Sequence, residues 1–461
     1  MAVSLQSVNP QLATIIQDNT LERIFKDSLF PRLLYRMEVQ ADKWAANIGE
    51  RMSFTKAGRL TVNTTPLTPG SDPTPSAYQF EQWVAEAAQY GNTLDTHMPT
   101  SAVALAPKVV KDAQQLGLNA GETLNILVRD RLFRAYLGGN TVTFAAASLG
   151  DTQIQVASLN GFTESLLNGV PVAVNSGAPI NVTFGGVSPP AANTVIAATP
   201  NDPNVPFGPG VLTLGAALSA NLGARVAVWA GTRSNIIRVG NGESVDAITG
   251  TNIMTLQTII NAVAALRSNN VPPHPSGYYH CHLNTSAMSQ LYQDAAWQTL
   301  HTALPDSVPY KDLVIGTMAK CYHYENTESP NSSNSGTLTS SGAGSSFVSS
   351  NIGGELINNT GIEIARCIIT GAGSIYEKYI DESAYMSEAG TTGKIGKFSV
   401  TNNGVQIMTE RIRYIMRAPL DRLQQTVAQT WSWSGDFPVP SDVLTGSSAR
   451  YKRAIILEHA A

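Results

Sequence analysis

Two stretches of the chain carry an apolar stripe at helical spacing. Residues 107–137 open with a proline at a first-turn position and end before Gly138 and Gly139, so we predict one helix of about 30 residues, ~45 Å long. Its apolar stripe comprises Ala113, Leu116, Ala120, Leu124 and Leu127, whereas Arg129 and the other charged residues lie off it. Residues 251–268 predict a second helix, whose inward positions are Leu256, Ile259, Ile260, Val263 and Leu266.

Residues 76–94 fit two incompatible patterns. At a period of 3.6, Phe80, Trp83 and Val84 fall on one helical face, which predicts ordinary core. At a period of two, the stretch is a strand that pairs with residues 51–62 across a proline-rich turn. The second pattern predicts a hairpin of more than forty residues, which the chain could not bury against itself.

Alternating patterns predict strands in much of the remaining chain. Residues 141–235 hold few charges and contain short alternating runs between turn signals, which predicts a small all-β module inserted into the chain. Residues 423–435 predict a strand that has Val427, Gln429, Trp431 and Trp433 on one face. Residues 1–45 predict short helices that form a packing or docking arm. The Ser/Gly-rich residues 328–351 predict a mobile surface loop.

Composition points to a folded protein that meets other protein. Apolar residues make up 43% of the chain, but charged residues only 14%, against ~25% in typical soluble domains. The net charge of −4 argues against nucleic-acid binding as the main task. Three cysteines in 461 residues fit a reducing compartment. No basic and apolar leader opens the chain, and no run of ~18 apolar residues occurs, so we expect synthesis in the cytoplasm and no membrane span.

Candidate chemistry is sparse. His280 and His282 on one predicted strand, with Cys321 and His323 on another, could offer four metal ligands if the strands were neighbours. The alternative is that these imidazoles simply belong to aromatic-rich strands. We expect no cofactor, because the glycines after residue 370 lack the third glycine of a dinucleotide loop.

A basic cluster on a predicted strand is a further candidate. Arg411, Arg413 and Arg417 alternate along residues 411–417, where they could meet acidic neighbours or DNA, or form a solvated sheet face. No pattern for catalysis stands out, and we expect no enzyme.

Read in order, five stretches resemble the major capsid proteins of tailed bacteriophages with the Hong Kong 97-like fold, and within them the coat proteins related to phage N4. The stretches are "TTPLTPGSDPTPSAYQFEQWVAEAAQYGNTLDTH", "RDRLFRAYLGGN", "LRSNNVPPHPSGYYHCHLNTSAMSQLYQDAAWQTLH", "IITGAGSIYEKY" and "DRLQQTVAQTWSWSG". This resemblance favours the strand interpretation of residues 76–94, since tertiary pairing often overrides local preference.

The resemblance implies an α+β fold with a defined order of parts. These are an N-terminal arm (1–47), an extended hairpin called the E-loop (48–97), the spine helix of a peripheral domain (98–140), the inserted β-rich domain (141–235), an axial domain with the Ser/Gly loop (236–375), and the peripheral sheet with the C-terminal segment (376–461).

The implied function is a major capsid protein that assembles with itself into the pentamers and hexamers of an icosahedral head around double-stranded DNA. We expect the E-loop to contact a neighbouring subunit through Phe54, Phe80, Trp83, Val84 and Tyr90. Further implied partners are scaffold, portal and decoration proteins, with DNA met weakly on the inner face and no membrane. The implied location is the virion, assembled in the host cytoplasm. Three alternatives remain open: an encapsulin-like cargo shell, a metal-dependent enzyme that uses the His/Cys strands, and a β-rich adhesin or tail component.

Overall fold

The computed structural model contains two compact units. One unit contains residues Met1–Met52, Ala85–Arg129 and Ile375–Pro438, and the other contains Ser53–Val84, Asp130–Ser374 and Val439–Ala461. The described residues are 20–29, 34–44, 49–57, 80–97, 108–186, 191–231, 235–302, 317–331, 337–342, 345–350, 354–380, 398–401, 404–409, 411–417, 425–442 and 453–461, together with a few single positions.

The first unit is built on a seven-stranded sheet. The strand order is β1-β21-β25-β24-β23-β22, and β4 pairs with β25 as well. The strands are β1 (Val39–Lys43), β21 (Ile375–Tyr379), β25 (Thr426–Asp436), β24 (Ile412–Arg417), β23 (Gly404–Thr409), β22 (Phe398–Thr401) and β4 (Ala88–His97). As the alternation predicted, Val427, Gln429, Trp431 and Trp433 of β25 are all buried.

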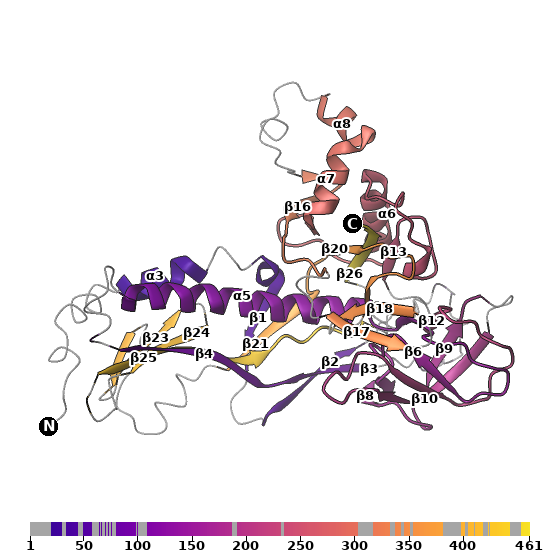
Figure 1. Ribbon diagram of the computed structural model, residues 1–461, viewed down its shortest axis with the longest axis horizontal. Coiled ribbons are helices and arrows are strands. Elements are labelled where there is room, and N and C mark those ends of the chain that lie inside the picture. Colours follow the sequence, from indigo (N-terminus) through magenta and orange to yellow (C-terminus); the bar gives the residue numbers. More distant parts are fainter. Residues whose placement is uncertain are drawn as a thin grey trace. The chain divides into compact units, whose positions relative to one another are not determined.

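The predicted long helix is α5 (Lys108–Leu137), and its first part packs on this sheet (Figure 1). Trp431 donates its indole N–H to Asn119 at 3.0 Å, and the Gln429 amide donates to the Val109 carbonyl at 3.2 Å. The buried face of α5 is wider than the predicted stripe. Next to that stripe, a second row of side chains, each four residues after the one before, is also buried. Arg129, expected on the polar side, belongs to that row, and Leu127 is only half-buried.

The described part of the N-terminal arm is only partly helical. Helix α3 (Thr20–Leu29) crosses α5 so closely at Gly117 that an added Cβ would lie 2.1 Å from Ser28 Oγ. A short 3-10 turn (Tyr35–Glu38) then leads into β1, which pairs in parallel with β21. The expectation of short helices throughout residues 1–45 is therefore wrong for residues 39–43, because pairing with a strand more than 300 residues away decides their conformation.

The second unit contains the predicted all-β module. Its six antiparallel strands have the order β5-β12-β9-β10-β11-β6. They are β5 (Asn140–Val142), β12 (Ala227–Ala230), β9 (Ile180–Phe184), β10 (Ala191–Pro200), β11 (Gly210–Leu214) and β6 (Gln153–Val156). Their inward side chains form one buried apolar cluster around Phe162, Phe184 and Leu212. A separate hairpin of β7 (Glu164–Leu167) and β8 (Val170–Ala173) belongs to the same module.

A mixed six-stranded sheet forms the other core of the second unit. Its order is β13-β26-β20-β14-β16-β15. The strands are β13 (Ile236–Arg238), β26 (Ala454–Ala460), β20 (Ile364–Thr370), β14 (Tyr279–Leu283), β16 (Cys321–Glu325) and β15 (Thr317–Met318), with the helices α6 (Leu256–Ser268), α7 (Thr285–Gln293) and α8 (Ala295–Thr302).

Three details of the second unit differ from expectation. The predicted domain 376–461 placed the C-terminal segment with the peripheral sheet, but β26 lies between β13 and β20 of the second unit. Ile260, expected inward, is 40% exposed beside a hollow of about 640 Å³ between α6 and the β15–β16 turn. The predicted loop 328–351 begins with the buried Ser329 and contains β17 (Thr337–Gly342) and β18 (Ser345–Ser350), which form a sheet with β19 (Glu355–Ile357).

Candidate functional site

The main candidate site is the hairpin of β2 (Arg51–Ala57) and β3 (Phe80–Glu86), a sheet of two strands only. No residue of β2 is fully buried, since its positions alternate between exposed and half-buried. The half-buried Phe54 stacks on Trp83, with ring centroids 5.7 Å apart. On the other face, Gln82 donates its amide N–H to Thr55 Oγ1 at 3.1 Å. These cross-strand pairs hold the register, but a two-stranded sheet is marginally stable alone in water.

The structure resolves the two patterns of residues 76–94 in favour of strand for the part it describes. It also divides the expected single strand in two, because β3 ends at Glu86 and β4 begins at Ala88. Whereas β3 pairs with β2, β4 pairs with β25 along its whole length. The proline-rich turn between β2 and β3 lies largely outside the described residues.

Four of the five predicted contact residues lie on the hairpin. Phe80 is 49% exposed, and Phe54, Trp83 and Val84 are half-buried. Tyr90 is different, because it lies on β4 with its ring 6.0 Å from that of Trp433 in the same chain. The structure therefore places Tyr90 on the seven-stranded sheet of the first unit and not on the β2–β3 hairpin.

Sequence reasoning missed a second hairpin that meets the first. The β7–β8 turn is Asn168-Gly169, the strongest local signal for a two-residue hairpin, and the backbone of Gly169 contacts β3. The main-chain N–H of Gln82 donates to the Gly169 carbonyl at 2.7 Å. Phe80 and the turn-flanking Leu167 and Val170 remain 44–49% exposed. The hairpin is thus partly supported by its own chain, contrary to the expectation that the chain could offer it no support.

The four candidate metal ligands do not form one site. Strands β14 and β16 are parallel neighbours, as the metal interpretation required, but in their register His280 pairs with Tyr322 and His282 with Tyr324. Directly paired residues share a sheet face, so both histidines lie on the face opposite to Cys321 and His323. The prediction of a four-ligand site is therefore wrong. It required His280 and His282 to pair directly with Cys321 and His323, and the observed register differs from that one by a single residue.

A buried cysteine and histidine lie close enough to suggest a nucleophile and base, but burial shifts their pKa values against that role. Cys367 Sγ is 3.8 Å from Nε2 of His459. Burial raises the pKa of Cys367 to about 12. Burial also lowers the pKa of His459 to about 4. A thiolate–imidazolium pair needs the opposite shifts, so this pair is neutral core at pH 7. All three cysteines are free and buried.

Two arginines of the basic cluster bond within the chain, and the side chain of the third, Arg417, lies outside the described residues. Arg411 pairs with the fully buried Glu377 at 3.1 Å, and the Arg413 Nε–H donates to Ser432 Oγ at 3.2 Å. Arg411 therefore meets an acidic neighbour, which was one of the alternatives left open for this cluster. The glycine-containing turn after β20 leads into strand β21 and not into a helix, so it is not a dinucleotide loop.

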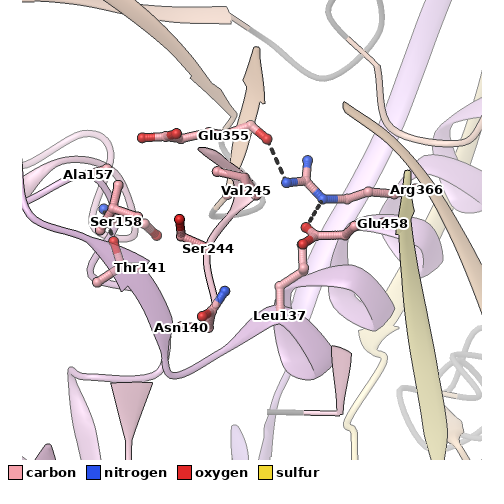
Figure 2. Close-up of a pocket in the computed structure, with 12 residues that line it drawn as sticks. Leu137, Asn140, Thr141, Ala157, Ser158, Ser244, Val245, Glu355, Arg366 and Glu458 are labelled. Atoms are coloured by element: carbon pink, nitrogen blue, oxygen red, sulfur yellow. Dashed lines mark hydrogen bonds and ion pairs between the residues drawn. The ribbon is translucent and has the colours of Figure 1, made fainter. Parts of the chain in front are cut away.

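A network of buried ion pairs surrounds a small cavity in the second unit (Figure 2). Glu458 accepts one N–H bond from Arg238 and one from Arg366, each at 2.8 Å. Arg225 of the inserted module binds both Asp246 and Glu355. The cavity holds about 20 Å³, enough for one water molecule. Arg366 Nη1 borders it and has no hydrogen-bond partner among the described residues.

The pKa values of Glu458 and Glu355, two carboxyl groups of this network, are shifted in opposite directions. The pKa of Glu458 is lowered, because the two arginines outweigh its burial. Burial raises the pKa of Glu355 to about 6, more than Arg225 lowers it, and the nearby charge of Asp246 adds to the rise. The folded state therefore binds a proton at Glu355 more tightly than the unfolded chain does.

Acidification should consequently strengthen folding through Glu355. From pH 7 to pH 5 its contribution to the free energy of unfolding should grow by about 1 kcal/mol, and it is lost again as the pH rises through 6. Urea titrations of wild type and Glu355→Gln at both pH values measure this contribution as a difference. An identical pH dependence in the two proteins would contradict the assignment.

Among the helices of the described residues, none combines the length and apolar character required to cross a membrane.

No family model matches the chain, and no curated protein matches it by sequence. The comparison with solved structures finds phage capsids. The capsid of cyanophage P-SCSP1u is 12% identical, with 93% of this chain and 88% of that chain covered and a TM-score of 0.49. The capsid of Ralstonia phage GP4 is 13% identical, with 92% and 87% covered and a TM-score of 0.48. The capsid of cyanophage Pam1 is 10% identical, with 95% and 92% covered and a TM-score of 0.47.

Proposed function

We propose that this chain is the major capsid protein of a tailed bacteriophage with a Hong Kong 97-like fold. In this role it assembles with itself into the pentamers and hexamers of an icosahedral head that encloses double-stranded DNA. The observation that carries the proposal is the β2–β3 hairpin, which has no buried residue on β2 and leaves Phe80 half exposed. A hairpin of this kind gains apolar burial when it lies across a second copy of the chain.

Repetition of such a contact builds a shell. The hairpin of one copy and the surface that it contacts on the next copy are different, so the contact is heterologous. Such contacts form a closed ring when repeated rotation from copy to copy adds up to a full turn. Obligate contacts of this type bury ~2,000–5,000 Å², an amount that suits a chain with sparse surface charge. The neutral cysteine–histidine pair and the split histidine strands favour a structural role over an enzymatic one. The net charge of −4 suits a wall that contains DNA without binding it tightly.

The sequence resemblance supports finer assignments within this proposal. It favours the coat proteins related to phage N4, a location in the virion after assembly in the host cytoplasm, and contacts with scaffold, portal and decoration proteins. We assign the inserted module to the outside of the shell, where it would brace neighbours or hold a decoration protein. Limited proteolysis of intact particles tests this position, and full protection of residues 141–235 until the shell is broken would contradict it.

The first test of the proposed function is assembly of the full-length protein. Wild type should form closed particles, detected by negative-stain microscopy and light scattering. Phe80→Asp should raise the protein concentration needed for assembly at least tenfold, because each ~1.4 kcal/mol lost from a contact is a tenfold change in its equilibrium. The thermal midpoint of the unassembled subunit should change little, since Phe80 is half exposed there.

Leu149→Asp is the matched control. Leu149 is also an exposed apolar residue, at 63%, but it belongs neither to β2 and β3 nor to β7 and β8. This variant should assemble like wild type. The proposal fails if wild type is a stable monomer whose β2–β3 amides are already fully protected from hydrogen exchange, or if Phe80→Asp and Leu149→Asp assemble equally well.

A further inference from the structure

The turn between β7 and β8 has a conformation that its two residues are suited to adopt. Asn168 has a φ of 51° and Gly169 a φ of 84°, so both lie in the left-handed region. The register closes directly around them, with Leu167 paired to Val170. Two left-handed residues in a two-residue loop define the tight hairpin turn whose twist matches that of its strands. The tip is therefore rigidly defined by local sequence.

The rigid tip contacts the backbone of β3. A Cβ added to Gly169 would lie 1.9 Å from the Phe80 carbonyl oxygen and 2.8 Å from its carbon. The Gln82 N–H donates to the Gly169 carbonyl at 2.7 Å, which satisfies a main-chain donor of β3. Only glycine permits this approach and this φ together. The adjacent Glu81 is fully buried, although β3 belongs to a sheet of two strands.

We propose that the Asn168-Gly169 turn is a latch that sets the direction in which the β2–β3 hairpin projects, and that the inserted module thereby positions the hairpin for its contact with a neighbouring copy. The proposal rests on the proposed function. The latch contacts Phe80 and Gln82, at the end of β3 that follows the turn of the hairpin, whereas the other end of β3, Glu86, leads into β4.

The latch can be opened by a single added carbon. Gly169→Ala should break the Gln82–Gly169 hydrogen bond, and amide exchange at Gln82 in the unassembled subunit should become about tenfold faster. Gly169→Asn should do the same, although asparagine tolerates the left-handed turn, because its Cβ meets the same carbonyl oxygen. Gly150→Ala is the matched control, since Gly150 has a φ of 93° in the same module but nothing within 4 Å of an added Cβ.

The size and closure of the assembled particles test whether the latch positions the hairpin. Gly169→Ala and Gly169→Asn should give particles that differ from wild type in diameter or closure, as measured by negative-stain microscopy, whereas Gly150→Ala should give wild-type particles. Unchanged exchange at Gln82 in both Gly169 variants would overturn the latch. Faster exchange with particles of wild-type diameter and yield would overturn the positioning role. Failure of wild type to assemble would instead contradict the proposed function, and the exchange measurement on the subunit would still decide whether the latch exists.

Discussion

Replacing Glu458 by glutamine is expected to lower the free energy of unfolding by about 3–5 kcal/mol, the usual effect of removing one partner from a buried ion pair. Glu458 is 1% exposed and accepts from the Nε–H groups of both Arg238 and Arg366. The neutral amide of glutamine removes the negative charge that offsets the buried positive charges of Arg238 and Arg366. Arg366 already has one N–H without a partner among the described residues, so the network has no spare acceptor for it.

Urea denaturation followed by circular dichroism measures this loss in the unassembled subunit. The matched control is Glu325→Gln, because Glu325 lies at the exposed end of β16 in the same six-stranded sheet. This control should change the free energy of unfolding by less than about 0.5 kcal/mol. Equal effects of the two substitutions would show that the buried network does not contribute as described.

Lowering the pH from 7 to 4.5 is expected to remove about 2.5 kcal/mol of stability for each of two buried histidines. Burial lowers the pKa of His323 to about 4, against a small opposing effect of its bond to the Met318 carbonyl. Burial likewise lowers the pKa of His459 to about 4. Between pH 6.5 and pH 4 the unfolded chain therefore binds protons at these histidines, whereas the folded chain does not. The contribution of the neutral histidines to the free energy of unfolding is present above pH 6.5 and is lost as the pH falls toward 4.

The geometry of both rings explains why they stay neutral. His323 Nε2 is 3.3 Å from the Met318 carbonyl, which requires the proton on Nε2, and the buried Nδ1 has no partner among the described residues. In His459, Nδ1 lies 2.7 Å from the Ala460 carbonyl and therefore carries the proton. A second proton would place a buried charge beside the Trp297 ring in the first case and the Cys367 thiol in the second.

Unfolding titrations of His323→Phe at pH 7 and 4.5 should show about half of the histidine-dependent loss. His97→Gln, which alters an exposed histidine on β4, should keep the full loss. A His323→Phe protein with the wild-type pH dependence would show that His323 has the same pKa in the folded and the unfolded chain. The smaller and opposite contribution of Glu355 is removed from the comparison by making it in the Glu355→Gln background.

Elements with long, regular patterns were predictable. The thirty-residue α5 and the alternating face of β25 follow from spacing alone, because burial of one face repeats every 3.6 or every two residues. The same reasoning predicted strands within residues 141–235, where the structure has a six-stranded antiparallel sheet. The spacing of apolar residues predicted too narrow a buried face for α5. Two neighbouring rows of its side chains are buried, and one of them contains Arg129.

The site was less predictable, since it depends on contacts between distant parts of the chain. Phe80 and Trp83 were identified from their place in the sequence, and Asn168-Gly169 carried a hairpin signal that could have been recognised. Nothing local to either segment indicates that the turn touches β3. The split of His280 and His282 from Cys321 and His323 likewise depends on a register that no single strand specifies.

By itself, the sequence determined the long helix α5 and the alternating buried face of β25, because each repeats one spacing over many residues. Only the tertiary structure decided which strands are neighbours, in what register, and that β26 completes the sheet of the second unit. Periodicity is a property of adjacent residues and can be read from them. Pairing between residues hundreds of positions apart depends on burial summed over a whole sheet, which no local stretch encodes.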